Sequence, residues 1–84
     1  MANALYALDI DTQALALAED GAHASERTLT LTRIQRQQGY SAEPAVLAAE
    51  QSWLQARAAQ TAARGALLGD AVALYQALGG GVLD

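Results

Sequence analysis

A ladder of small residues runs through the second half of the chain, with steps that alternate between four and three positions. A mean spacing of 3.5 residues keeps one stripe of a helix facing a partner helix along its length. Because small side chains let two backbones approach closely, the ladder predicts a long helix packed tightly along another. We expect the packing seam to consist of Ala45, Ala49, Ala56, Ala59, Ala63, Ala66, Ala73 and Ala77, with Ser52 and Asp70 at the remaining steps.

Bulky apolar residues occupy the heptad positions beside this ladder. We expect them to form a broad face turned away from it, so that the second helix contacts neighbours on more than one side. They are Val46, Trp53, Leu67 and Leu74 in one series and Leu47, Leu54, Leu68 and Tyr75 in the next.

The first half of the chain also carries two apolar series. Positions two residues apart on a helix are separated by about 200°, so these series face nearly opposite directions. Such a helix has neighbours on both flanks, either in a wall of helices or at the centre of an oligomer. The series are Leu8, Leu15, Ala22 and Leu29, and Ile10, Leu17, Ala24 and Leu31.

Composition favours an all-α chain. Alanine occupies 21 of the 84 positions, proline occurs once and phenylalanine is absent, which is typical of long helices. A chain of this length forms one small domain and buries a modest share of its surface when it folds alone. We therefore expect the isolated chain to be oligomeric.

Charge and residue types argue against several classes of function. The net charge is −4 and the five arginines are scattered, which disfavours nucleic-acid binding. No apolar run is long enough to span a bilayer, and we expect any export signal to lie upstream of Met1. With no cysteine and a single histidine, the sequence indicates neither catalytic residues nor a bound metal or cofactor.

The clearest break in the helical pattern lies between residues 38 and 44. Gly39 can adopt the left-handed conformation that ends a helix, and Pro44 fits the first turn of the next one. The sequence therefore predicts a long, coiled-coil-like antiparallel hairpin spanning residues 1–84. Its parts are a helix over about 4–38, a tip at 39–43, a helix over about 44–78 and a flexible glycine-rich C-terminus.

A second break is conceivable at Asp20-Gly21, since glycine inside a helix costs about 1 kcal/mol relative to alanine. A loop there would give three helices instead of two. The heptad phase continues through Leu15, Ala22 and Leu29 without a slip, so we expect one continuous helix.

Three polar or small features have two interpretations each. His23 lies between Glu19 and Glu26 on one helix face and indicates either a metal site or, as we expect, a solvated salt-bridging cluster with Arg27. Asp70 either makes a polar contact with a neighbouring helix or is exposed near a fraying end. The third feature, two glycines four residues apart at 65 and 69, indicates a close helix contact or tolerated interior glycines.

Three stretches around and after the turn form a pattern with a known parallel. The run Leu31-Thr32-Arg33 precedes the turn, Gly39 lies at its tip, and Val46-Leu47-Ala48-Ala49-Glu50-Gln51 follows. The most specific stretch is the last, Asp70-Ala71-Val72-Ala73-Leu74-Tyr75-Gln76-Ala77-Leu78-Gly79-Gly80-Gly81. In order and spacing these stretches resemble the closing segment of the outer-membrane efflux protein family, the TolC-like ducts and their lipoprotein relatives.

The resemblance implies a structural piece of a trimeric outer-membrane channel that exports drugs or metal ions. In that family, long antiparallel helices form a periplasmic tube, which works with a periplasmic adaptor and an inner-membrane pump. Members are much longer, so the chain corresponds to the last helical hairpin. By position, Gly39, Tyr40 and Ser41 would form the periplasmic tip that docks the adaptor.

The chain departs from the family pattern near the tip. Arg36 stands where members often have an aromatic residue, and Pro44 stands where a hydrophobic one is common. Ala45 and Ala48 replace acidic residues that ring the closed aperture in some relatives. We therefore expect no cation-binding ring at this hairpin.

A second interpretation stays open on the residues alone. An independent helical hairpin could self-associate, for example into a four-helix bundle, and serve as an assembly module. Both interpretations are structural and non-enzymatic.

Overall fold

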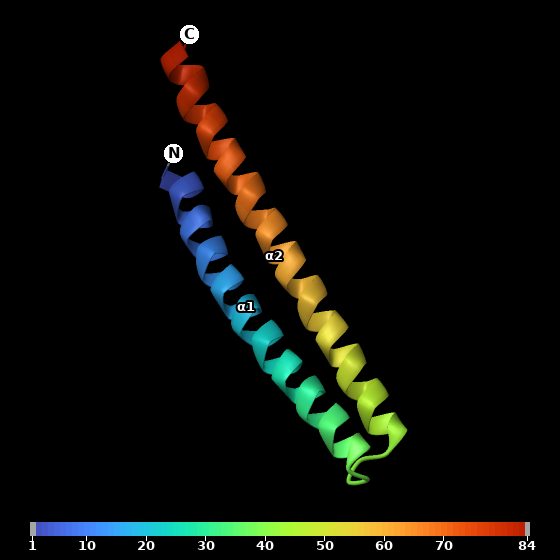
Figure 1. Ribbon diagram of the computed structural model, residues 1–84. Helices are drawn as coiled ribbons and strands as arrows, with labels where there is room; N and C mark the ends of the chain where they lie inside the picture. The colour runs from blue at the N-terminus through green and yellow to red at the C-terminus, as the bar shows by residue number, and fades with distance from the viewer. Residues whose placement is uncertain (1, 84) are drawn as a thin grey trace.

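The chain folds into one antiparallel helical hairpin. The computed structural model describes residues 2–83, and side chains from residue 3 to residue 79. Helix α1 spans Ala2–Gln37 and helix α2 spans Glu43–Leu83, and no strand occurs in the described range. Figure 1 shows the two helices side by side, with both termini at one end and α2 extending past α1. The two helices over the described residues confirm the predicted all-α class, and the hairpin measures 66 × 15 × 13 Å.

Helix α1 runs without interruption through Gly21, so the predicted continuity is confirmed. A single interior glycine weakens a helix by about 1 kcal/mol, which one heptad-matched partner helix readily offsets. On the same helix, Gln13 Nε2 donates a 3.2 Å hydrogen bond to Asp9 Oδ2, one turn away.

Helix α2 differs from its predicted boundaries at both ends. It begins at Glu43, one residue before Pro44, and it continues through the three glycines to Leu83 rather than ending near residue 78. This corrects the predicted glycine-rich exit. Glycine lowers helix propensity but keeps its backbone N–H and carbonyl groups for helical hydrogen bonds, and residues 79–84 contain no proline.

Ion pairs between the helices define the register of the hairpin. Arg33 Nη2 lies 3.2 Å from Glu50 Oε1, and Arg64 Nη2 lies 3.8 Å from Glu19 Oε1. The two pairs are fourteen residues apart on each helix, from 19 to 33 and from 50 to 64. Because this separation is two heptads on both sides, the helices keep one coiled-coil register over that length.

The side chains that are buried or half-buried between the helices recur at heptad spacing. The most buried is Leu29, at 3% exposure, followed by Ala22 and Ala49. We call the set at the heptad positions given next the hairpin seam. It comprises Leu8, Asp11, Leu15, Ala18, Ala22, Ser25, Leu29 and Thr32 from α1, and Val46, Ala49, Trp53, Ala56, Gln60, Ala63, Leu67, Asp70 and Leu74 from α2.

The composition of the hairpin seam overturns one expectation. Val46, Trp53, Leu67 and Leu74 do not turn away from the small-residue ladder, because they lie half-buried in the seam together with alternate ladder residues. Two adjacent heptad stripes of α2 could each have faced α1. Turning the bulky stripe inward removes more apolar area from water, which accounts for the observed choice.

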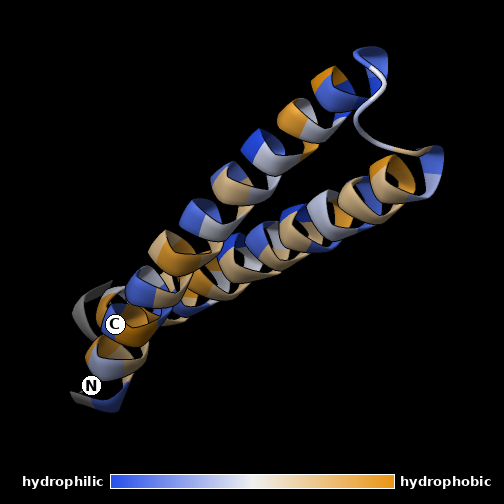
Figure 2. Cartoon of the chain, turned by 90° about the horizontal axis from the view of Figure 1, so that it is seen from below, coloured by the Kyte–Doolittle hydropathy of each residue, from blue (hydrophilic) through white to orange (hydrophobic). Residues whose placement is uncertain are grey.

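Large apolar side chains remain exposed on the outer flanks of both helices. Along the chain, hydrophobic and hydrophilic residues alternate in bands on both helices in Figure 2. Two heptad series stand out, which we call the α1 flank stripe and the α2 flank stripe. They are Ile10, Leu17 and Leu31 on α1, and Leu47, Leu54, Leu68 and Tyr75 on α2, exposed by between 45% and 77%.

Neither helix, within the residues that the structure describes, has a stretch apolar enough and long enough to span a bilayer.

Candidate functional site

The turn between the helices is closed by backbone hydrogen bonds around Gly39. The Tyr40 N–H donates to the Gln35 carbonyl at 2.7 Å, and the Gly39 N–H donates to the Arg36 carbonyl at 3.0 Å. These two bonds form a Schellman motif, which satisfies carbonyls at the end of α1. Gly39 has a φ of +83°, as the predicted left-handed cap requires.

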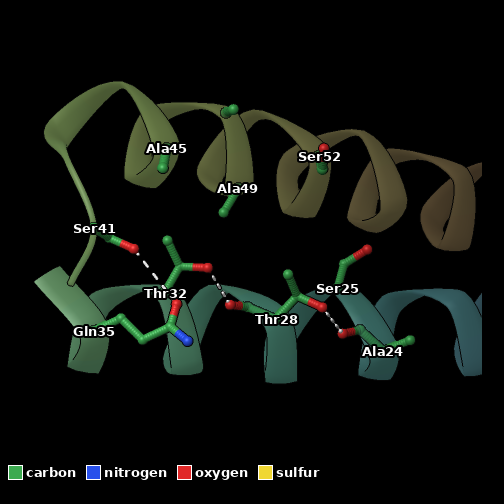
Figure 3. Close-up of a pocket in the computed structure, with 10 residues that line it drawn as sticks. Ala24, Ser25, Thr28, Thr32, Gln35, Ser41, Ala45, Ala49 and Ser52 are labelled. Atoms are coloured by element: carbon green, nitrogen blue, oxygen red, sulfur yellow. Dashed lines mark hydrogen bonds between the residues drawn. The ribbon is translucent and has the colours of Figure 1, made fainter.

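The tip beyond Gly39 presents one exposed aromatic ring and one half-buried hydroxyl. Tyr40 is 81% exposed, so its ring stands clear of the hairpin. Ser41 Oγ lies 3.4 Å from Gln35 Oε1, to which it donates a weak hydrogen bond (Figure 3). The Ala45 N–H donates to the Ala42 carbonyl at 3.1 Å, which starts α2 without a side-chain cap.

An open groove of about 590 Å³ runs from the tip along one face of the hairpin. Figure 3 shows short side chains from both helices lining it. We call it the small-residue groove; its lining is Ala24, Ser25, Thr28, Thr32, Gln35, Ser41, Ala45, Ala48, Ala49 and Ser52.

Two threonines in the groove use their hydroxyls internally. Thr28 Oγ1 donates to the Ala24 carbonyl at 3.1 Å, and Thr32 Oγ1 donates to the Thr28 carbonyl at 2.7 Å (Figure 3). Their donors are therefore committed to the helix backbone. Most side chains that line the groove are small, and few of them have a free hydrogen-bond donor. Such a surface suits the packing of another helix better than the recognition of a charged ligand.

The opposite face of the hairpin carries the charged side chains. Glu50 is rotated about the axis of α2 by about 140° from Ala45 and by about 160° from Ser52, which line the groove. A third ion pair, Arg36 Nη2 to Glu43 Oε2 at 3.8 Å, lies beside the turn. The hairpin thus has one uncharged, grooved face and one face crossed by ion pairs.

The predicted seam alanines fall into two groups in the structure. Ala49 is buried and Ala56 and Ala63 are half-buried, so these three face α1. The others are exposed to solvent, and contact with further helices stays a prediction for them: Ala45, Ala59, Ala66, Ala73 and Ala77.

Asp70 lies half-buried in the hairpin seam and meets another carboxyl group, Asp11 of α1. The hydrogen bond with Asp70 is the main cause that raises the pKa of Asp11 above 3.8, followed by desolvation and by repulsion between the like charges. Sequence reasoning expected Asp70 to have a polar partner or to face water. It did not identify Asp11 as that partner. Asp11 lies seven residues from both Ala4 and Ala18, and this heptad spacing could have indicated that it faces α2.

The predicted cluster around His23 is arranged differently from the expectation. Glu19 pairs with Arg64 of α2 rather than with Arg27. His23 is exposed and borders a shallow hollow with Glu26 and Arg57, and Arg57 lies over the Trp53 ring at 5.4 Å. Among the described residues, no three acidic, histidine or cysteine side chains gather closely enough to hold a metal ion.

Gly65 and Gly69 are both exposed, and a Cβ added at either would meet no atom within 4 Å. Within one hairpin they are therefore tolerated interior glycines. A close approach of a neighbouring molecule at these positions stays a prediction.

Sequence reasoning also missed the cross-helix ion pairs. Arg33–Glu50 and Glu19–Arg64 are both centred between Ser41 and Ala42, so pairing residues outward from that point could have found these two. The pairs are partly exposed, and each contributes at most about 1 kcal/mol.

Comparison with known proteins identifies one related family. A family model described as outer membrane efflux protein matches residues 1–80, nearly the whole chain. No curated protein and no solved structure matches the chain significantly.

Proposed function

The chain belongs to the outer membrane efflux protein family, and we propose that its hairpin is a wall segment of the periplasmic tube of an efflux channel. The role is structural: hairpins pack side by side to enclose a passage for the exported drug or metal ion. The family is one of transport proteins, and we assign no catalytic step to this chain.

The observation that carries this proposal is the pair of exposed flank stripes. Only Ala22, Leu29 and Ala49 are buried among the described apolar residues, while large side chains on both outer flanks face solvent. Exposed apolar stripes of this length mark contact surfaces. Because one stripe lies on α1 and the other on α2, a hairpin needs a neighbour on each side.

The geometry of the stripes favours unlike contacts between neighbours. When antiparallel hairpins stand side by side in one orientation, α1 of one lies next to α2 of the next. The α1 flank stripe of one copy then meets the α2 flank stripe of another, which is a heterologous contact that extends into a wall or closes into a ring. In the three-fold channel of the family, two hairpins from each chain would complete the ring.

A complementation experiment tests this arrangement. Leu17→Glu disables the α1 flank stripe and Leu54→Glu disables the α2 flank stripe, while the matched control Gln55→Glu adds the same charge beside Leu54. We expect each leucine variant to lose higher oligomers in analytical ultracentrifugation. An equimolar mixture of the two regains dimers, because each variant keeps one intact stripe.

The symmetric alternative gives a different result. If copies associate through like stripes, as in an independent four-helix bundle, one variant associates normally and the mixture forms no new species. That outcome would contradict the proposed wall segment and would favour the independent, self-associating hairpin. A well-folded monomer of the unmodified chain would refute both.

We further propose that Gly39, Tyr40 and Ser41 dock the periplasmic adaptor. Support comes from the exposed Tyr40 ring at the apex and from the small-residue groove that starts beside it. The groove can receive an adaptor helix without displacing a charged side chain, and the exposed alanines Ala45 and Ala48 let its backbone come close. The adaptor and the inner-membrane pump are implied by the family.

The tip assignment is tested in the efflux protein that contains this hairpin. Gly39→Leu disfavours the left-handed turn, and Tyr40→Ala removes the exposed ring without touching the backbone. We expect both to reduce adaptor cross-linking and drug resistance while the protein still reaches the outer membrane. The control is Gln51→Ala, at an exposed position farther along α2; normal efflux in both tip variants would contradict the assignment.

A further inference from the structure

Two acidic residues face each other inside the hairpin seam near its open end. Asp11 and Asp70 are both half-buried and, unlike the half-buried Glu19 and Glu50, they make no ion pair among the described residues. Each lies one heptad farther from the turn than Ala18 and Ala63, the residues that precede the ion-paired Glu19 and Arg64. The register therefore brings the two carboxyl groups to the same level of the hairpin, where the neighbouring Asp70 raises the pKa of Asp11.

Among the residues that the structure describes, no arginine lies within five positions of Asp11 or Asp70 along either helix. On α1, the nearest other acid is Asp9, which accepts a hydrogen bond from Gln13, and the Thr12 hydroxyl donates to the Leu8 carbonyl at 2.8 Å. On α2, residues 66–69 and 71–74 carry no charge, and the nearest arginine, at position 64, is paired with Glu19.

Two neighbouring ionised carboxylates repel each other, whereas one proton held between them forms a strong hydrogen bond. We propose that Asp11 and Asp70 form an acid-sensitive clasp: uptake of one shared proton fastens the open end of the hairpin, and loss of that proton loosens it. The turn end, held by the Schellman motif and by ion pairs, does not respond in the same way.

The direction in which stability changes with pH follows from the pKa shift of Asp11. The pKa of Asp11 is raised in the folded chain, so the folded state binds the proton more tightly than the unfolded chain does. The added stability is present in acid and is lost as the pH rises through the raised pKa. The response therefore lies at pH values above 3.8, the ordinary value.

Spin-label distances measure the clasp directly. The sequence has no cysteine, so pairs introduced at exposed positions take up labels uniquely. One pair, Asn3→Cys with Gln76→Cys, reports the open end, and a second, Thr30→Cys with Gln51→Cys, reports the turn half. Measurements use the full chain, with labelled copies diluted among unlabelled ones.

We expect the distance distribution at the open end to narrow when the pH falls from neutrality through the raised pKa of Asp11, with no change in the turn half. Asp70→Asn should give a narrow distribution at both pH values, because an amide can donate to Asp11 without a shared proton. The matched control, Asp9→Asn, should behave as the unmodified chain. An equal pH response in the Asp70→Asn variant would overturn the clasp.

Carbon-detected NMR titration of the aspartate carboxyl groups supplies an independent measurement. In the unmodified chain, the Asp11 carboxyl should titrate above 3.8, and in Asp70→Asn its midpoint should fall toward that value. An unchanged midpoint in the variant would show that the pair shares no proton, and the proposal would fail.

Discussion

Replacing Gly39 by alanine tests how much of the hairpin depends on one backbone conformation. Gly39 has a φ of +83°, and a Cβ built there meets no atom within 4 Å, so crowding contributes nothing. The left-handed region costs a non-glycine residue about 1–2 kcal/mol. Lower entropy of the unfolded chain returns about 0.4–1 kcal/mol. We expect a net loss of about 1 kcal/mol in the free energy of unfolding.

The same substitution at Gly21 is the matched control. Gly21 lies inside α1, and a Cβ there also meets no atom within 4 Å. Alanine should stabilise that helix by about 1 kcal/mol. The two variants therefore shift stability in opposite directions, and Gly39→Asn should fall between Gly39→Ala and the unmodified chain because asparagine tolerates the left-handed region.

Urea and thermal unfolding followed by circular dichroism measure both effects. A change of 1 kcal/mol corresponds to a shift of about 4–8 °C in Tm for a domain of this size. All chains are compared at one concentration, because self-association raises the apparent stability. If Gly39→Ala left the unfolding free energy unchanged, or if both alanine variants shifted it the same way, the reasoning about the turn would be refuted.

Two further predictions concern the hairpin seam and the charged face. Leu29→Ala should lower the free energy of unfolding by about 2–5 kcal/mol because Leu29 is 3% exposed. Leu31→Ala, at 55% exposure, should lower it by less than about 1 kcal/mol. Equal losses for the two variants in urea titrations would contradict the assignment of Leu29 to the hairpin seam. The Arg33–Glu50 pair, whose side chains are 55% and 38% exposed, should give a coupling of about 0.2–1 kcal/mol in a double-mutant cycle with Arg33→Gln and Glu50→Gln, and the coupling should shrink in salt. A salt-independent coupling above about 2 kcal/mol would show that the pair is effectively buried.

Local chemistry explains why the turn could be predicted in detail. Gly39 and Pro44 act through their own backbone restrictions, so the left-handed cap follows from residue type, and the start of the next helix follows to within one residue. The end of α2 was predicted less well. Glycines at 79–81 lower helix propensity without imposing a stop, and the helix continues to Leu83.

Periodicity could not decide which stripe of α2 faces α1. The ladder series through Ala45 and the bulky series through Val46 both repeat every seven residues, and both neighbour the series through Ala49. Burial decided in favour of the bulky series, so Trp53 lies in the hairpin seam and Ala45 in the groove.

The sequence by itself determined the elements of this protein: two long helices, one left-handed turn, apolar stripes on more than one side, and the family resemblance confirmed over residues 1–80. Each depends on residue type or on spacing along one segment. Only the tertiary structure decided the pairings, including Arg33 with Glu50, Glu19 with Arg64, and Asp11 with Asp70. A pairing depends on how one helix is rotated and shifted against the other, and the packing energy of the whole hairpin sets both.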